Sequence, residues 1–138
     1  MKIAFMFPGQ GAQTTGMGKD IYDEYDEAKK VYDKASDILQ MDIKKLCFEA
    51  EQEELNKTEN AQKAILVTSL AMLEILRKYN IKADICTGLS LGEYTALIYS
   101  GYLSFEDGLK LIRKTWILHA KFYSKRELQN GSNNRIRQ

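Results

Sequence analysis

Proline, histidine, cysteine and tryptophan are all scarce in this sequence. Its 138 residues include one proline, one histidine, two cysteines and one tryptophan. Cys47 and Cys86 have neither CxxC spacing nor a histidine partner, so the sequence indicates neither a disulfide framework nor a zinc site. We expect both to be buried thiols, and we expect no metal and no cofactor.

No sign of charge dominates either. Lys and Arg number 20 against 19 Asp and Glu, so the chain lacks the field that would hold nucleic acid or an anionic membrane. The longest apolar run near the start, residues 3–7, is too short for a signal sequence and far too short to span a bilayer. We therefore expect a cytoplasmic protein that binds neither nucleic acid nor membrane.

The apolar residues that are present predict two short strands. The length, with 44% hydrophobic residues, is that of one small globular domain with a core. The run over 3–7 is closed by Pro8 and Gly9, and this predicts a fully buried, parallel strand. A second strand is predicted over 83–86, and helical character resumes over 91–99 after a tight turn.

Between these strands the spacing of apolar residues predicts helices. An amphipathic helix is expected over 21–39 and a largely buried one over 61–79. The charged stretch over 42–60 is less periodic, so we expect short helical pieces there, with Thr58 or Asn60 as a cap.

Residues 88–92, Gly-Leu-Ser-Leu-Gly, fit the pattern G-x-S-x-G. In that pattern a serine sits on a sharp turn from strand to helix, and glycines are needed because a Cβ would clash there. A predicted strand precedes the motif and a predicted helix follows it, so we predict that Ser90 is a catalytic nucleophile. The alternative is a plain Gly-Ser-Gly turn in which Ser90 caps the helix by accepting a backbone N–H bond.

A serine nucleophile needs hydrogen-bond donors for the oxyanion, and losing one donor typically costs ~2.7–4 kcal/mol. Leu91 supplies one N–H because it starts the helix, and the turn over 9–11 is the candidate for the second. That glycine-rich loop fails the dinucleotide fingerprint, because Thr14 stands where glycine is needed. It also fails the nucleotide P-loop, because Met17 stands where lysine is needed. The remaining alternative is a flexible turn.

Two segments together resemble a known family. Residues 7–13, Phe-Pro-Gly-Gln-Gly-Ala-Gln, and residues 88–94, Gly-Leu-Ser-Leu-Gly-Glu-Tyr, are similar to the paired signatures of malonyl-CoA:acyl-carrier-protein transacylases. Their separation and the intervening segments 55–58 and 61–62 are similar to the family pattern too. The resemblance covers about residues 1–114.

The resemblance implies ping-pong transfer of a malonyl group from malonyl-CoA to acyl carrier protein, in fatty acid biosynthesis, through an ester on Ser90. The backbone N–H groups of Gln10 and Leu91 would form the oxyanion hole, and Gln62 would contact substrate. The implied fold is α/β, a partial α/β-hydrolase-like core of parallel strands with flanking helices. The family's ferredoxin-like subdomain, inserted from its second half, would be lacking.

Three features depart from the family. Leu89 replaces the usual histidine before the serine, which puts substrate choice in doubt but leaves the elbow intact. The family's catalytic histidine belongs to a later segment, and His119 matches no family base, so we expect it to be a surface residue. Thr115 stands where an arginine would bind the malonyl carboxylate. Arg113, two residues earlier, would point to a different face of its helix and so would not replace that arginine.

We predict two regions: residues 1–114, the N-terminal part of an acyltransferase catalytic domain, and residues 115–138, an atypical tail. When residues 115–138 are reverse-translated with permitted codons and the result is read one base later, an arginine at position 115 and a family-like continuation can emerge. We therefore hypothesise a one-base frameshift. Without the catalytic histidine and the arginine that binds the malonyl carboxylate, a chain truncated in this way is expected to be weak or inactive alone. A serine esterase or thioesterase and a non-catalytic fragment are the alternatives.

Overall fold

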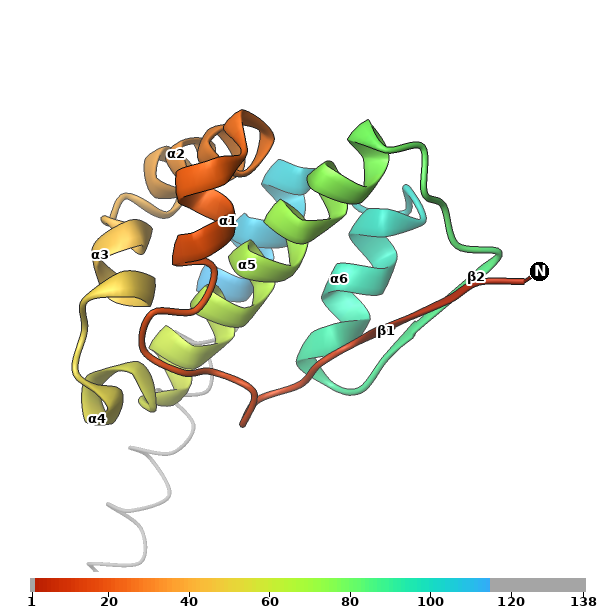
Figure 1. Cartoon of the computed structure of the whole chain (residues 1–138). Helices are drawn as coiled ribbons and strands as arrows, with labels where there is room; N and C mark the ends of the chain where they lie inside the picture. The colour runs from red at the N-terminus through yellow and green to blue at the C-terminus, as the bar shows by residue number, and fades with distance from the viewer. Residues whose placement is uncertain (1, 115–138) are drawn as a thin grey trace, which may run out of the picture.

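Two parallel strands that lie far apart in the sequence form a sheet in the described part of this protein. The computed structural model describes residues 2–114. Strand β1 (Ala4–Phe7) pairs with β2 (Ile85–Gly88), and Phe7 lies opposite Gly88. Because the strands are parallel, their carboxyl ends meet at one edge of the sheet, beside the start of α6 (Figure 1).

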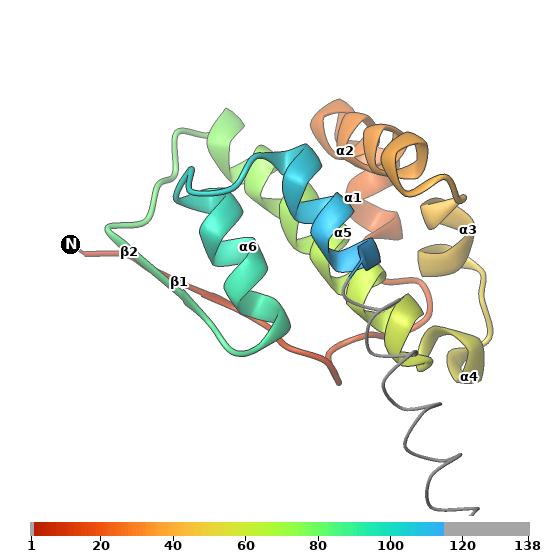
Figure 2. The same cartoon turned by 180° about the vertical axis from the view of Figure 1, so that it is seen from behind.

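Helices make up most of the described chain. Between the strands lie α1 (Lys19–Glu24), α2 (Asp26–Leu39), α3 (Ile43–Phe48), α4 (Gln52–Leu55) and α5 (Thr58–Lys78), and after β2 comes α6 (Leu91–Tyr99). Helical backbone resumes from residue 105 to residue 114. In Figure 1, α5 separates α1, α2 and α3 from α6 and the sheet, and Figure 2 shows the last helical segment beside α5. The predicted α/β architecture of parallel strands with flanking helices is confirmed.

The core lies around α5, whose middle turns are buried nearly all round, as the sequence predicts. Tyr32 of α2 is fully buried, and its hydroxyl lies 2.8 Å from the Thr68 hydroxyl of α5. Cys47 of α3 is fully buried beside them, whereas Cys86 is half-buried. The prediction of two buried thiols therefore holds fully for Cys47 alone. No helix within residues 2–114 is long and apolar enough to cross a membrane.

The prediction of one continuous helix over 21–39 is wrong. The backbone of Tyr25 is extended, with φ −118° and ψ 122°, and it separates α1 from α2. Its ring packs edge-on against Tyr79, with centroids 6.5 Å apart, and lies under the Lys78 ammonium. The spacing of apolar residues continues through the break because both helices pack on the same core, so periodicity alone does not reveal it.

The prediction of a fully buried β1 is also wrong for the residues that the structure describes. One face of the sheet is covered: Phe5 packs on Tyr99 of α6, with ring centroids 5.2 Å apart. On the other face Met6 is 79% exposed and Ile85 is 66% exposed. A continuous apolar run is typical of a strand covered on both sides, but residues 2–114 contain helices on one side only.

The ends of the later helices follow local rules with one exception. Asn80 and Gly101 adopt positive φ just beyond α5 and α6, as expected for helix ends. Neither Thr58 nor Asn60 caps α5, because the helix already begins at Thr58 and its N-cap is Lys57. The hydroxyl of Thr58 is used elsewhere, in a contact with the loop after β1.

Candidate active site

Ser90 lies on the turn between β2 and α6, in a strained conformation. Its φ of 53° and ψ of −108° are rare for a residue with a side chain, and such conformations cost about 1–3 kcal/mol. Ser90 is exposed, and its side chain makes no capping hydrogen bond to α6. The alternative prediction, a helix-capping serine, is therefore wrong. The strained turn instead presents the Ser90 hydroxyl to solvent, as a nucleophile elbow requires.

The two glycines that flank Ser90 are required by close packing. A Cβ on Gly88 would lie 2.1 Å from the carbonyl carbon of Gly92. A Cβ on Gly92 would lie 2.3 Å from the carbonyl oxygen of Phe7. Both distances are far below van der Waals contact, so only glycine lets the first turn of α6 pack against the carboxyl ends of both strands. The predicted steric reason for the G-x-S-x-G pattern is confirmed.

The loop after β1 reaches the same edge of the sheet. A Cβ on Gly9 would lie 3.0 Å from the carbonyl oxygen of Leu89, so this loop packs against the residue before the serine. The backbone N–H groups of Gln10 and Leu91 donate no hydrogen bond to any group within residues 2–114. Two unpaired backbone donors therefore lie near the elbow. Their role as the oxyanion hole stays a prediction.

Side chains from α4 and the start of α5 hold this loop. Gln52 accepts from the Thr15 backbone N–H at 3.0 Å, and Gln13 donates to Asn56 at 3.0 Å. The side chain of Gln10 donates to the Thr58 hydroxyl at 3.2 Å. Sequence reasoning noted segment 55–58 and Gln13 only as parts of a family pattern, and it missed Gln52 altogether. The only available signal was a group of amide side chains in an otherwise charged stretch.

Gln62, the predicted substrate contact, lies on α5 one helical turn after Thr58. Residues four apart share a face of a helix, so Gln62 is on the face that meets the loop carrying Gln10. It is half-buried, and its side chain makes no hydrogen bond within the described part of the chain. Its amide is thus free to bind a ligand at this edge, and its assignment stays a prediction.

Residues 2–114 contain neither a histidine nor a free arginine at this site. His119 and Thr115 lie outside the described residues. Arg113 donates from Nη2 to Oε1 of Gln40, at 3.0 Å, and so is engaged with the end of α2. This agrees with the expectation that Arg113 does not replace the carboxylate clamp. The described residues also include no group of three or more His, Cys, Asp or Glu that could hold a metal ion.

Leu89 gives the elbow an apolar side. Its side chain is 78% exposed, although it is a large hydrophobic residue directly before Ser90. Its carbonyl oxygen accepts a hydrogen bond from the Gly92 N–H at 3.0 Å, and this bond helps to close the turn. The backbone of Leu89 therefore has a structural role, while its side chain is available to whatever approaches the serine.

Comparison with known proteins places this geometry in a family. The profile of the acyl transferase domain family matches residues 4–129. Malonyl CoA-acyl carrier protein transacylase from Bacillus subtilis (strain 168) is 48% identical over 113 residues, which cover 82% of this chain and 36% of the relative. The match extends past position 114, and the predicted tail from residue 115 stays a prediction.

Solved structures agree with the sequence match. The crystal structure of malonyl CoA-acyl carrier protein transacylase from Clostridium perfringens superposes with a TM-score of 0.79 at 49% identity, covering 83% of this chain and 36% of that one. A malonyl-transacylase in complex with its type II PKS acyl-carrier protein superposes with a TM-score of 0.78 at 33% identity, covering 82% and 37%. The chain thus spans about a third of the length of these relatives. On its sequence and its fold, the chain belongs to the acyl transferase domain family.

Proposed function

We propose that Ser90 is the acyl-accepting nucleophile of a malonyl-CoA:acyl-carrier-protein transacylase. The observation that carries the proposal is the strained Ser90 elbow, held between two glycines and packed against the loop that carries Gln10. A protein retains a strained residue of this kind only when the surrounding packing enforces it, and such strain gathers at active sites. The names and folds of the relatives indicate malonyl transfer as the chemistry of such a site.

In the first half-reaction the Ser90 Oγ attacks the thioester carbonyl carbon of malonyl-CoA, and a C–O bond forms. The oxyanion of the tetrahedral intermediate accepts hydrogen bonds from the backbone N–H groups of Gln10 and Leu91. The C–S bond then breaks, and coenzyme A leaves as the thiol after receiving the serine proton through a general base. Residues 2–114 contain no histidine, the base that most often activates a serine nucleophile.

In the second half-reaction the pantetheine thiol of acyl carrier protein attacks the malonyl ester on Ser90. A C–S bond forms, the ester C–O bond breaks, and Ser90 regains its proton. A relative solved with its acyl-carrier protein supports this partner. The proposal includes Gln62 as a substrate contact, a cytoplasmic protein, and no nucleic acid or membrane partner. The near-balanced charge of the chain supports these exclusions.

Incubation of the full chain with malonyl-CoA, followed by intact-protein and peptide mass spectrometry, tests the proposal. We expect a malonyl ester to form slowly on Ser90, in keeping with a chain that is weak alone, none on a Ser90→Ala variant, and loss of the ester when holo acyl carrier protein is added. Loss of the ester to water at the same rate with and without carrier protein would instead indicate an esterase or thioesterase. No ester at all, where the Bacillus relative is labelled, would indicate a non-catalytic fragment.

A further inference from the structure

We propose that Gln52 is a positioning residue that holds the loop after β1, with Asn56 and Gln13 as its intermediaries. Together these three amide side chains, called the amide clamp below, fix the loop backbone at Gly11, Gln13 and Thr15. The inference rests on the proposed function, in which this loop supplies the N–H of Gln10 to the oxyanion. Its structural part is testable whether or not the chain is active.

The first arm of the amide clamp uses the carbonyl of the Gln52 side chain. Its Oε1 accepts the backbone N–H of Thr15 at 3.0 Å. The hydroxyl of Thr15 donates to the carbonyl oxygen of Ala50 at 2.8 Å, just before α4. Thr15 is therefore fixed through both its backbone and its side chain, and the far end of the loop is tied to α4.

The second arm uses the nitrogen of the same side chain. Gln52 Nε2 donates to Asn56 Oδ1 at 2.8 Å and to the carbonyl oxygen of Gln13 at 3.3 Å. Asn56 Oδ1 also accepts from Gln13 Nε2 at 3.0 Å, and Gln13 Oε1 accepts the backbone N–H of Gly11 at 2.8 Å. The relay from Gln52 thus ends on the residue next to Gln10, where Gly11 has a φ of 110°. Fixing the Gly11 N–H restrains the backbone rotation that aims Gln10.

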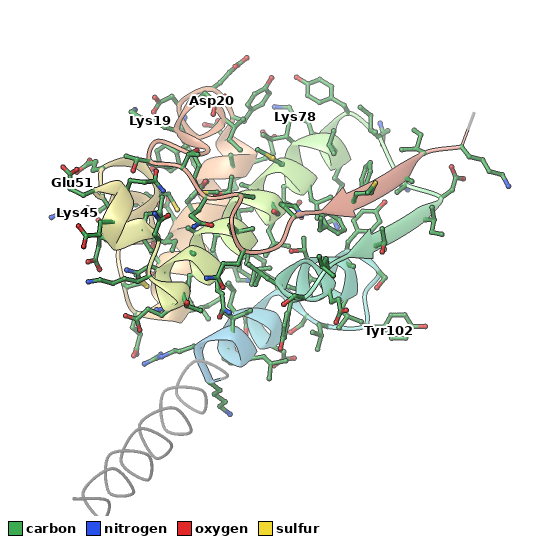
Figure 3. All side chains as sticks on the ribbon, turned by 90° about the horizontal axis from the view of Figure 1, so that it is seen from below. Lys19, Asp20, Lys45, Glu51, Lys78 and Tyr102 are labelled. Atoms are coloured by element: carbon green, nitrogen blue, oxygen red, sulfur yellow. The ribbon has the colours of Figure 1, made fainter. Side chains whose placement is uncertain are left out.

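The chemistry of the amide clamp suits a site where negative charge develops. Gln52 lies in the run Glu51-Gln52-Glu53-Glu54, and within residues 2–114 it is the member of that run with hydrogen bonds to the loop. An amide both accepts and donates, so one side chain serves both arms. A carboxylate there would put a negative charge beside the oxyanion loop and oppose the charge that forms in the reaction. Figure 3 shows Glu51, the residue before Gln52, beside Lys45 where α3 leads into α4, far from Tyr102.

Four variants test the two arms of the amide clamp separately, because each variant keeps a different set of hydrogen-bond donors and acceptors. Gln52→Ala removes both arms, and Gln52→Glu keeps an acceptor for Thr15 but loses the donor. Asn56→Ala breaks the relay to Gly11, whereas Asn56→Asp keeps the Oδ1 that accepts from both glutamines. Glu53→Ala, an exposed change on the same helix, is the matched control.

Amide proton exchange with water is measured by magnetisation transfer in the ¹⁵N-labelled full chain. The Thr15 N–H reports on the first arm and the Gly11 N–H on the second. Loss of a hydrogen bond should speed exchange about fivefold. We expect faster exchange of Thr15 in Gln52→Ala only, and of Gly11 in Gln52→Ala, Gln52→Glu and Asn56→Ala. Asn56→Asp and Glu53→Ala should match the parent. Unchanged exchange of Gly11 in both alanine variants would overturn the inference.

The rate of Ser90 esterification by malonyl-CoA then tests the link to catalysis. We expect the alanine variants to lower the maximal rate of esterification by about tenfold, with the half-saturating malonyl-CoA concentration unchanged. Asn56→Asp should restore only part of the rate, because its carboxylate keeps the acceptor but adds a negative charge beside the oxyanion loop. Faster Gly11 exchange with an unchanged esterification rate would show that the clamp does not serve Gln10. A parent chain that is never esterified would refute the proposed function, while the exchange pattern would still decide whether the clamp exists.

Discussion

The α-carbon of Gly92 packs directly on the backbone of Phe7, so that a Cβ on Gly92 would lie 2.3 Å from the Phe7 carbonyl oxygen. Residues 85 positions apart in the sequence therefore meet as bare backbone. This contact brings the start of α6 to the end of β1, and with it the Leu91 N–H to the loop that carries Gln10. The packing around Gly92 is what assembles the elbow.

Gly92→Ala should therefore destabilise the protein strongly. The added methyl group meets backbone that cannot rotate away, so we expect a loss of about 3 kcal/mol in the free energy of unfolding, at the upper end for overpacking. Urea denaturation followed by circular dichroism measures it. Gly101→Ala is the control: a Cβ there meets nothing within 4 Å and suffers only from the positive φ, so we expect a loss of about 1 kcal/mol. Equal losses would contradict the packing argument.

Ser90→Gly should relieve the strain at the elbow. Glycine adopts a φ of 53° without a Cβ penalty, whereas alanine does not. We expect Ser90→Gly to be about 1 kcal/mol more stable than Ser90→Ala, despite the greater chain entropy of unfolded glycine. Thermal and urea unfolding of the two variants, neither of which can carry a malonyl ester, provide the comparison. A less stable glycine variant would show that the turn is not strained.

The Cys47 thiol should make stability depend on alkaline pH. Burial raises the pKa of Cys47 from the ordinary 9.0 to about 12, so the folded protein keeps a proton that the unfolded chain releases. This contribution is fully present below pH 9 and is lost as pH rises from about 9 to about 12. Urea midpoints of the parent and of Cys47→Ala across that range measure it, and the parent should lose more stability on raising the pH.

The same burial predicts unequal thiol reactivity. At pH 8 a thiol-exchange reagent should modify the half-buried Cys86 quickly and the buried Cys47 only after unfolding. Rapid titration of both thiols in the native protein would mean that the core around Cys47 opens readily.

The face of the sheet that residues 2–114 leave uncovered should make the chain self-associate. Met6 and Ile85 are large, apolar and mostly exposed on adjacent parallel strands, and no charged residue interrupts β1 or β2. We expect Met6→Thr with Ile85→Thr to lower light scattering at high concentration several-fold, because threonine keeps the strand propensity and removes the apolar surface. A threonine change at exposed Leu111, on the last helical segment, is the control and should have little effect.

The elements next to Ser90 could be predicted because local steric rules decide them. Strand, glycine, serine, glycine and helix follow one another without a spacer, and only one kind of turn accommodates that order. The helix over 91–99 and the helix end at Gly101 are confirmed for the same reason. The break at Tyr25 could not be predicted, because an extended residue between two amphipathic helices leaves the apolar spacing intact.

The sequence by itself determined the family, the strand–turn–helix around Ser90 and the need for glycine at 88 and 92. Each of these depends on neighbouring residues or on the spacing of motifs. Only the tertiary structure decided that one face of the sheet is left uncovered by residues 2–114 and that Gln13 meets Asn56 across 43 positions. Contacts of that kind depend on how α4 and α5 pack beside β1. Their polar side chains follow no periodic pattern, so no short stretch of sequence encodes the amide clamp that holds the loop of Gln10 beside the serine.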